Sequence, residues 1–385
     1  MQITMLLSNA FRPDTRVLKE AQSLAKAGFD ITIICWDRLA ELPARDTLPS
    51  GVRIHRIQNV RSTYGVGARQ IFTLLRFWRS TLHLLANLQP DMIHCHDFDT
   101  LPCGLFWGKV HHIPTIYDAH EYYADLVRPR LSGLIGKLLF LVIHAAEKIT
   151  ARMASAVVTV DETLAEIYNR LNQHVLVLGH YPQKDLAEFY NPIFTRSELT
   201  LLYVGRISID RGARVNIDLL RLLRDLNIPA RLRFAGVFTP MNEELLIQQH
   251  AQGLENYIEY LGWIPYQQMQ DLYHSADIGL AILLPESRYI AALPVKLFEY
   301  MASGLPVIAS NFPAITTLVN ETKCGALMDP LLQPLEIARI IEIWWKKPSI
   351  PRSIGENGRQ AVLSRYNWDC QSERLSKLYR QLLRR

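Results

Sequence analysis

Short apolar segments alternate with longer amphipathic segments along nearly the whole chain. The apolar segments carry few polar side chains on either face, which is typical of strands in a parallel sheet that is covered on both sides. The amphipathic segments have helical spacing. This alternation predicts an α/β fold with doubly wound parallel sheets. The strands expected in the first half of the chain are residues 3–8, 31–35, 52–57, 92–96, 114–118, 155–160 and 174–178.

A second series of strands follows a break in this pattern. Prolines and polar residues cluster around residues 179–198, as in an interdomain linker. The chain has 385 residues, which exceeds what one hydrophobic core usually supports. We therefore expect two Rossmann-like domains at 1–180 and 199–365, a linker at 181–198 and a last helical segment at 366–385. The strands expected in the second domain are 199–205, 231–236, 257–262, 277–283, 306–310 and 325–328.

Composition narrows the class of protein further. Hydrophobic residues make up 49% of the chain and charged residues 21%, which argues against disorder. The net charge of +5 suits anionic ligands but is too dispersed to indicate nucleic-acid binding. The five cysteines are scattered and odd in number, which favours reduced thiols and a cytoplasmic location. The start lacks the features of a secretory signal, and no apolar stretch reaches the length of a spanning helix.

Ligands of open parallel sheets bind beyond the carboxyl ends of the strands, so the loops after strands are where chemistry is expected. Arg206 directly follows the strand at 199–205, and Arg211 opens the next helix. Two guanidinium groups at that position could clamp a diphosphate through charge-assisted hydrogen bonds. From the residues alone, two ordinary surface arginines remain an equal alternative.

Residues 293–310 (LPVKLFEYMASGLPVIAS) predict a helix over about 295–303 followed by a strand. Pro294 is well placed at the helix start, where an amide would otherwise lack a partner. The free amides near Val295 and Lys296, together with the helix dipole, form a second candidate anion site. Glu299, one turn into the helix, could accept hydrogen bonds from both hydroxyls of a ribose; a solvated or capping glutamate is the alternative.

Several segments together resemble one family. LLYVGRISIDRG and LPVKLFEYMASGLPVIAS are similar to the two nucleotide-binding segments of the retaining glycosyltransferases of family 4, also called glycosyl transferases group 1, many of which assemble polysaccharides and lipid-linked glycans. The resemblance extends over nearly the whole chain. It includes RPDTRVLKEAQSLAKAGFDITII (12–34), DMIHCHD (91–97), TIYDAHEYY (115–123) and ENGRQAVLSRYNWD (356–369).

The resemblance implies a fold and a set of roles. The fold is GT-B, in which two Rossmann-like domains face a cleft and the last helix, here within 366–385, crosses back to pack on the first domain. Arg206 and Arg211 would contact the diphosphate of a nucleotide sugar, and Glu299 would bind the ribose. His120 would lie beside the donor sugar, so that His120, Arg206 and Arg211 are the expected catalytic residues. Pro294, Val295 and Lys296 would complete the donor site.

This chain departs from the family pattern at one expected position. The family carries two glutamates with seven residues between them, and the first would fall at residue 291, where this chain has Ala291. That glutamate normally contacts hydroxyls of the donor sugar. Lys296 also occupies a position that is often proline. We interpret the change as altered sugar recognition, with Glu286 as a candidate substitute.

The segment HCHDFD raises the question of a metal. His94 and His96 lie on one face of the expected strand and could ligate zinc, and Asp97 with Asp99 forms a DxD sequence. Neither pattern has a partner at regular spacing elsewhere, so we expect no metal and no cofactor. His96 and Asp97 are expected instead to line the cleft near the acceptor, together with Asp14, Arg16 and Glu121.

Two helical segments suggest contact with a membrane surface. Residues 69–88 and 128–148 combine apolar faces with arginines, lysines and a tryptophan, as interfacial helices do. Ordinary packing of both helices on the sheet is an equal alternative. Lipid-linked acceptors in the family favour peripheral attachment to the inner face of the cytoplasmic membrane.

The sequence therefore predicts a retaining, metal-independent glycosyltransferase that moves a sugar from a nucleoside-diphosphate sugar to a hydroxyl of a glycan or lipid-linked acceptor. Two alternatives remain. One is a nucleotide-sugar epimerase of the same fold. The other is a non-catalytic partner that binds nucleotide or glycan for another transferase, which the alanine at 291 motivates.

Overall fold

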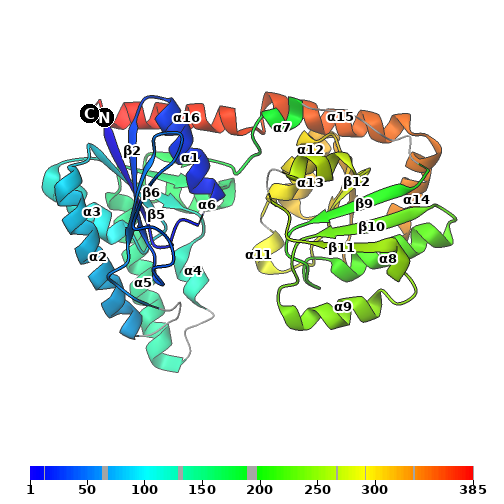
Figure 1. Ribbon diagram of the computed structural model, residues 1–385, viewed down its shortest axis with the longest axis horizontal. Helices are drawn as coiled ribbons and strands as arrows, with labels where there is room; N and C mark the ends of the chain where they lie inside the picture. The colour runs from blue at the N-terminus through cyan, green and yellow to red at the C-terminus, as the bar shows by residue number, and fades with distance from the viewer. Residues whose placement is uncertain are drawn as a thin grey trace. The chain divides into compact units, whose positions relative to one another are not determined.

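The structure is a computed structural model that describes residues 1–12, 14–62, 68–128, 133–188, 197–265, 268–290, 292–332 and 334–384. The chain divides into two compact units. Unit 1 contains Met1–His180 and Gln371–Arg385, and unit 2 contains Tyr181–Cys370. Each unit has a central sheet with helices on both faces (Figure 1), so the predicted α/β, doubly wound fold class is confirmed.

The sheet of unit 1 has the strand order β3-β4-β2-β1-β5-β6-β7-β8. Neighbouring strands pair in parallel, except that β3 runs antiparallel to β4. The expected strands are present, and β3 is an addition: its exposed sequence RDT carries no apolar signal. The strands are β1 (Gln2–Leu7), β2 (Asp30–Trp36), β3 (Arg45–Thr47), β4 (Arg53–Ile57), β5 (Met92–His96), β6 (Thr115–Ala119), β7 (Ala156–Thr159) and β8 (Val175–Val177).

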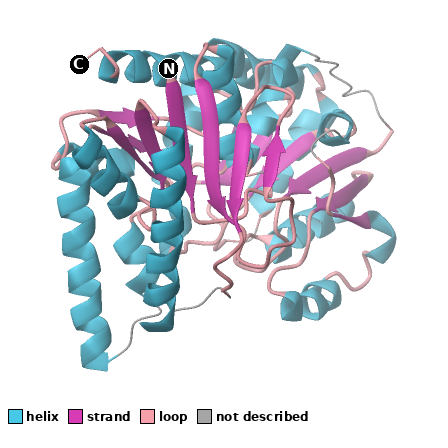
Figure 2. Cartoon of the chain, turned by 60° about the vertical axis from the view of Figure 1, so that its left-hand side comes forward, coloured by secondary structure: helices cyan, strands magenta, loops and turns pink. Residues whose placement is uncertain are grey.

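Helices cover both faces of this sheet (Figure 2). Since side chains alternate along a strand, Cys95 and His94 of β5 point to opposite faces. Cys95 packs against Gly104 of α3, whereas His94 contacts residues of α1 and of the last helix, α16. The helices of unit 1 are α1 (Thr15–Lys26), α2 (Ala68–Leu88), α3 (Leu101–His111), α4 (Tyr123–Val127), α5 (Gly133–Met153), α6 (Glu162–Asn169) and most of α16 (Trp368–Leu382).

The last helix is part of the core of unit 1. Leu375 and Tyr379 are fully buried, and the Tyr379 ring lies 5.7 Å from the ring of Phe29, at the start of the chain. The red C-terminal helix therefore runs beside the blue N-terminal strands in Figure 1.

Unit 2 has a six-stranded parallel sheet with the order β11-β10-β9-β12-β13-β14. Its strands are β9 (Leu199–Val204), β10 (Ala230–Ala235), β11 (Ile258–Gly262), β12 (Ile278–Ala281), β13 (Val307–Ser310) and β14 (Gly325–Met328). Its helices are α7 (Asp185–Glu188), α8 (Ala213–Asp225), η2 (Met241–Glu243), α9 (Glu244–His250), η3 (Glu255–Tyr257), α10 (Met269–His274), α11 (Ser287–Ile290), α12 (Val295–Ala302), α13 (Pro313–Thr322), α14 (Leu335–Lys346) and α15 (Ser349–Ser364).

Within the described ranges, no helix combines the length and the apolar character that a bilayer span requires.

Candidate functional site

The loop after β9 lies where the strand order of unit 2 changes direction, since β10 lies on one side of β9 and β12 on the other. Doubly wound sheets bind ligands at the carboxyl end of such a switch point. Gly205 and Gly236 end β9 and β10 there. A Cβ on Gly236 would lie 1.8 Å from the Gly205 carbonyl oxygen, so only glycine permits this approach of the two strand ends.

Arg206 and Arg211 both project from this loop. Arg206 is exposed, and its carbonyl oxygen accepts a hydrogen bond from the Tyr203 hydroxyl at 2.6 Å. Arg211 precedes Gly212, which has φ 76° and whose Cβ would meet the Ile282 carbonyl at 2.5 Å. Among the described residues, neither guanidinium group forms an ion pair with a carboxylate. Two guanidinium groups that form no ion pair within the described ranges therefore lie at a ligand-binding position.

Helix α12 is attached to the same strand end. The Tyr300 hydroxyl accepts a hydrogen bond from the Val204 amide at 2.8 Å, which holds the helix against the end of β9. The helix begins at Val295, directly after Pro294, as the sequence predicted. Glu299 is half-buried, and its carboxylate accepts a hydrogen bond from the Tyr273 hydroxyl at 2.9 Å.

Lys296 lies inside this arrangement. Its side chain is buried, and its Nζ lies 3.5 Å from the centroid of the Tyr203 ring, a cation–π distance. Nζ has no hydrogen-bond partner within the part of the chain that the structure describes. Burial lowers the pKa of Lys296 well below its usual range, the charge of Arg211 lowers it further, and Glu299 opposes both. Lys296 Nζ is therefore a buried nitrogen with no hydrogen-bond acceptor among the described residues.

Sequence reasoning missed two residues beside Arg211. Asp210 accepts hydrogen bonds from Ser208, from Arg288 and, at 2.9 Å, from the Tyr289 hydroxyl. The Tyr289 ring also lies 5.1 Å from the Arg211 guanidinium carbon. Asp210 and Tyr289 are 79 positions apart, so only the tertiary fold brings them together. The candidate substitute Glu286 is exposed, and Ala291 lies outside the described residues.

The corresponding position in unit 1 holds a buried histidine cluster, which we define as His94, His96, Asp118 and His120. It lies at the ends of β5 and β6. One oxygen of Asp118, Oδ2, lies 2.9 Å from His96 Nδ1, 3.2 Å from His120 Nε2 and 3.5 Å from His94 Nε2. The structure therefore gathers three histidines around one carboxylate.

The cluster shifts the acidity of its members. Burial alone would raise the pKa of Asp118, but the histidines, His120 foremost, hold that pKa well below its usual range. Burial alone would lower the pKa of His120, but Asp118 outweighs it and raises the pKa. For His94, burial dominates and lowers the pKa to about 4. A charged His120 beside an ionised Asp118, with a neutral His94, is the favoured arrangement.

Glu20 of α1 completes the surroundings of the cluster. Its Oε2 lies 4.0 Å from His94 Nε2, and neither of its oxygens has a hydrogen-bond partner among the described residues. Burial raises the pKa of Glu20 well above its usual range, and the charge of Asp118 adds to this. Ligand atoms of Glu20, His94, His96 and Asp118 all lie within 4.8 Å of one another, so these four could hold a divalent cation. The predicted absence of a metal stays a prediction.

The other residues predicted to lie near the acceptor differ in their contacts and in their burial. Asp14 caps α1 and accepts hydrogen bonds at 3.3 Å from Arg16. Asp97 has a left-handed backbone with φ 63°, and its amide donates to the Asp118 carbonyl at 3.0 Å. Burial raises the pKa of Asp97. Glu121 is exposed and is not brought into the cluster.

Sequence reasoning named the histidines but missed three groups that contact them. The His180 ring stacks on His120 with centroids 5.5 Å apart, and the Tyr379 hydroxyl hydrogen-bonds to His94 Nδ1. Glu20 is the third. The only signal for Glu20 is a charged residue on the inward face of a helix, between Val17 and Leu24. No sequence pattern indicates the contact of Tyr379.

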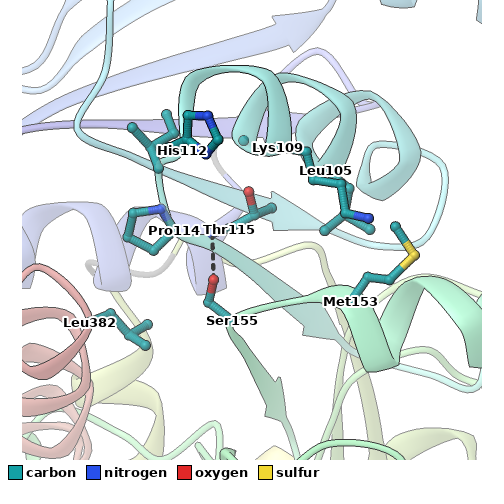
Figure 3. Close-up of a pocket in the computed structure, with 10 residues that line it drawn as sticks. Leu105, Lys109, His112, Pro114, Thr115, Met153, Ser155 and Leu382 are labelled. Atoms are coloured by element: carbon teal, nitrogen blue, oxygen red, sulfur yellow. Dashed lines mark hydrogen bonds between the residues drawn. The ribbon is translucent and has the colours of Figure 1, made fainter. Parts of the chain in front are cut away.

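A separate cavity of about 450 Å³ lies in unit 1 near the amino ends of β6 and β7. Figure 3 shows it between Leu105, Met153 and Leu382, with the Thr115 amide donating to the Ser155 hydroxyl at 3.1 Å. Because its lining is at the opposite end of these strands from the histidine cluster, the cavity is not part of the candidate site.

Two models of known protein families match the chain, one in each unit. The family model described as "Glycosyl transferases group 1" matches residues 193–361, and the model described as "Glycosyl transferase 4-like domain" matches residues 13–177. The first match contains Arg206, Arg211 and Glu299, and the second contains the histidine cluster. Together the two matches cover the candidate residues of both units.

The chain is also similar to individual proteins, both in sequence and in structure. The chain is 28% identical over 281 residues to a GDP-mannose-dependent alpha-(1-6)-phosphatidylinositol dimannoside mannosyltransferase of Mycobacterium tuberculosis, covering 69% of this chain and 68% of that protein. Among solved structures, sucrose-phosphate synthase from Thermosynechococcus elongatus aligns with a TM-score of 0.77 at 19% identity, over 99% of each chain. Anabaena HepE in complex with UDP-glucose aligns with a TM-score of 0.70 at 14% identity, over 99% of this chain and 100% of that chain. These two structures show the GT-B fold.

Proposed function

Because the chain belongs to the group 1 glycosyltransferases of the family 4 type, we propose that it transfers a sugar, with retention and without a metal ion, from a nucleoside-diphosphate sugar to a hydroxyl of a glycan or lipid-linked acceptor. The observation that carries this proposal is the set of unpaired cations in unit 2. Within the described ranges, Arg206 and Arg211 form no ion pair with a carboxylate, and Lys296 Nζ has no hydrogen-bond partner. A diphosphate would supply oxygens to all three groups.

The same groups would stabilise the leaving group. When the bond between sugar and diphosphate breaks, negative charge develops on the diphosphate, and fixed cations already in place lower the barrier. Such preorganised charge can replace the electrostatic role of a divalent ion. The amides at the start of α12 add to it, since Leu297 is the first residue of that helix whose amide is bonded back, to the Pro294 carbonyl at 3.0 Å.

Glu299 is proposed to bind the ribose. One oxygen of its carboxylate accepts a hydrogen bond from the Tyr273 hydroxyl, which orients the carboxylate. The Glu299 side chain is half-exposed at the start of α12. A carboxylate accepts hydrogen bonds through two oxygens, which suits two adjacent hydroxyl groups.

Unit 1 is proposed to supply the acceptor side of the reaction. Nε2 of His120 lies 3.2 Å from Asp118 Oδ2. Nδ1 of His120 has no hydrogen-bond partner in the described part of the chain. Asp118 raises the pKa of His120, which favours the charged form, and a charged His120 could donate to an oxygen of the donor or acceptor. Asp14, Arg16, His96 and Asp97 surround it, whereas Glu121 does not.

A lipid-linked acceptor is proposed from the surface of unit 1. Helix α2 exposes Ile71, Phe72 and Leu75, and α5 exposes Leu138, Leu141 and Val142. Lys137 and Lys148 of α5 are charged groups on the same helix, as an anionic membrane surface would favour. Residues 129–132 of the predicted segment 128–148 lie outside the described residues. The mycobacterial relative is named for a phosphatidylinositol dimannoside, which agrees with such an acceptor.

Membrane contact is tested by co-sedimentation with vesicles of phosphatidylcholine, with and without phosphatidylglycerol. We expect salt-sensitive binding to the anionic vesicles, and we expect the double substitution Phe72→Ser, Leu75→Ser to weaken it without changing thermal stability. Equal sedimentation of both proteins would remove the membrane from the proposal and leave the transfer reaction untouched.

The transfer itself is tested with donors first and acceptors second. A thermal-shift series with UDP, GDP, UDP-glucose and GDP-mannose should stabilise the wild-type protein with at least one nucleotide and should fail with Glu299→Ala. The matched control is Glu336→Ala, an exposed glutamate of α14. No stabilisation by any nucleotide would contradict the proposal.

The alternatives give different products. Nucleoside diphosphate released only when an acceptor is present indicates transfer, whereas a changed sugar that is still attached to its nucleotide indicates an epimerase. Binding without turnover for every donor and acceptor would favour a non-catalytic partner.

A further inference from the structure

A side chain from the far end of the chain contacts the histidine cluster. Tyr379 of α16 is fully buried, and its hydroxyl hydrogen-bonds to His94 Nδ1 across 285 positions of sequence. The Tyr379 ring packs on Phe29 with centroids 5.7 Å apart and on His94 with centroids 5.9 Å apart. The last helix therefore places the Tyr379 hydroxyl at the edge of the histidine cluster.

This contact restricts the tautomer of His94. The Tyr379 hydroxyl lies on Nδ1, whereas Nε2 faces carboxylate oxygens, so the arrangement that satisfies both nitrogens has the hydroxyl donating to Nδ1. A neutral imidazole has one donor and one acceptor nitrogen, so an accepting Nδ1 leaves the proton on Nε2. That Nε2 faces Asp118 Oδ2 at 3.5 Å and Glu20 Oε2 at 4.0 Å.

The effect passes on to His120 through a shared oxygen. Asp118 Oδ2 is the atom that faces His94 Nε2, and it is also the atom 3.2 Å from His120 Nε2. If Nδ1 of His94 took the proton, the Nε2 lone pair would point at the carboxylate and repel it. Asp118 would then turn or shift, and its pairing with His120 would change. Few groups can compensate, since all of these side chains are buried.

We propose that Tyr379 is a positioning residue for His120, acting through the tautomer of His94 and the orientation of Asp118. Docking of the last helix on unit 1 thereby sets the state of the histidine that the proposed function places at the reaction. The proposal rests on that function only for the consequence on turnover. The titratable groups that face the cluster from the surrounding elements are Asp14, Arg16 and Glu20 from the start of the chain, His96 and Asp97 at β5, and His180 after β8.

The test uses Tyr379→Phe, which removes only the hydroxyl and keeps the ring on Phe29. The matched control is Tyr168→Phe in the same unit, because the Tyr168 hydroxyl is also buried and donates to Glu147 at 2.8 Å, away from the cluster. Full-length protein with ¹⁵N-labelled histidine is studied by long-range ¹H–¹⁵N NMR, which reports ring tautomers. His94→Gln and His120→Gln assign the signals.

We expect His94 to carry its proton on Nε2 in wild type and in Tyr168→Phe, and to populate both tautomers in Tyr379→Phe. The His120 ring signals and their titration midpoint should move in Tyr379→Phe alone. With the donor that the thermal-shift series selects, kcat should fall about tenfold while the donor KM stays unchanged, as expected for losing one hydrogen bond of ordinary strength.

Other results would overturn the proposal. Unchanged His94 and His120 signals in Tyr379→Phe would contradict it, and so would equal changes in Tyr168→Phe. Elemental analysis that finds one tightly bound zinc or other divalent ion per chain would also contradict it, because the ion would fix the histidine nitrogens in place of Tyr379. Altered His120 signals with unchanged turnover would support the positioning and contradict the role given to His120 in transfer.

Discussion

The two units place polar groups at the same position of similar sheets but treat their charges in opposite ways. In unit 1, the charges are buried and paired with each other: Asp118 has three histidines around one oxygen. In unit 2, Arg206 and Arg211 lack any carboxylate partner among the described residues, and Lys296 Nζ has no hydrogen bond. Both arrangements follow a strand end, yet only the second is short of an anion.

This difference indicates that the two units have different roles. A buried, internally paired cluster is stable without ligand, and it holds a histidine in one defined state. An excess of cations is costly without ligand, and its cost is relieved when an anion binds. The first arrangement suits a group that must be oriented, and the second suits a site that must attract and hold a diphosphate.

The largest effect is expected from breaking the paired charges of unit 1. Asp118→Asn removes the carboxylate that three histidines share and leaves His120 without its counterion. We expect the free energy of opening of this region to fall by about 3–5 kcal/mol, as for other broken buried pairs. Hydrogen exchange of β5 and β6 amides measures it. Asp125→Asn, an exposed change on α4, is the control, and equal exchange in both variants would contradict the pairing.

The next effect concerns the unpaired cations of unit 2. Arg211→Ala should lower kcat/KM by about 10²–10³, in the range seen when one preorganised group that stabilises developing negative charge is removed. Stability should change little, since Arg211 forms no ion pair in the part of the chain that the structure describes. Arg221→Ala, whose guanidinium contacts only the His250 carbonyl among the contacts described, is the comparison for activity. Full activity of Arg211→Ala would remove it from the diphosphate site.

A smaller effect separates stability from binding at Lys296. Methionine in its place keeps the apolar stem over Tyr203 but removes the buried Nζ. We expect Lys296→Met to raise the free energy of unfolding by about 1 kcal/mol, because an unsatisfied buried group is lost. The same change should weaken nucleoside-diphosphate binding. Chemical denaturation and thermal shift with UDP and GDP measure the two effects, and a loss of stability would contradict the unpaired state of Nζ.

The smallest effect is on pH dependence. The pKa of His94 is lowered to about 4 and that of His180 to about 3, chiefly by burial. The unfolded state then binds more protons than the folded state, so both histidines cost stability as the pH falls from their unfolded pKa, about 6.5, toward these values. The raised pKa of His120 acts oppositely: its contribution is full below the unfolded pKa and is lost as pH rises through the folded pKa.

We therefore expect slow exchange of β5 and β6 amides at pH 7 and a net loss of protection by pH 5, after correction for intrinsic exchange rates. His94→Gln removes one of the histidines whose pKa is lowered by burial and should reduce the loss. A loss that is equal in wild type and His94→Gln would show that other groups cause it.

The fold could be predicted further than the site. Buried strands such as Ile31–Ile34 and Val307–Ala309 stand out because parallel sheets need apolar residues on both faces. The exposed strand β3 could not be predicted, since its pairing depends on β4 and not on its own residues. Arg206, Arg211 and Glu299 were found because they lie in short segments with fixed spacing. Glu20, Asp210, Tyr289 and Tyr379 were not, since their contacts join distant parts of the chain.

The last helix also has a consequence for how the chain is made. Unit 1 needs Gln371–Arg385, but synthesis reaches these residues only after all of Tyr181–Cys370. At about 5–20 residues per second, the first 180 residues wait roughly 10–40 s for their missing helix. Throughout that interval, the surface of unit 1 that Leu375 and Tyr379 will cover is exposed to water. Unit 2, although encoded later, is therefore complete before unit 1.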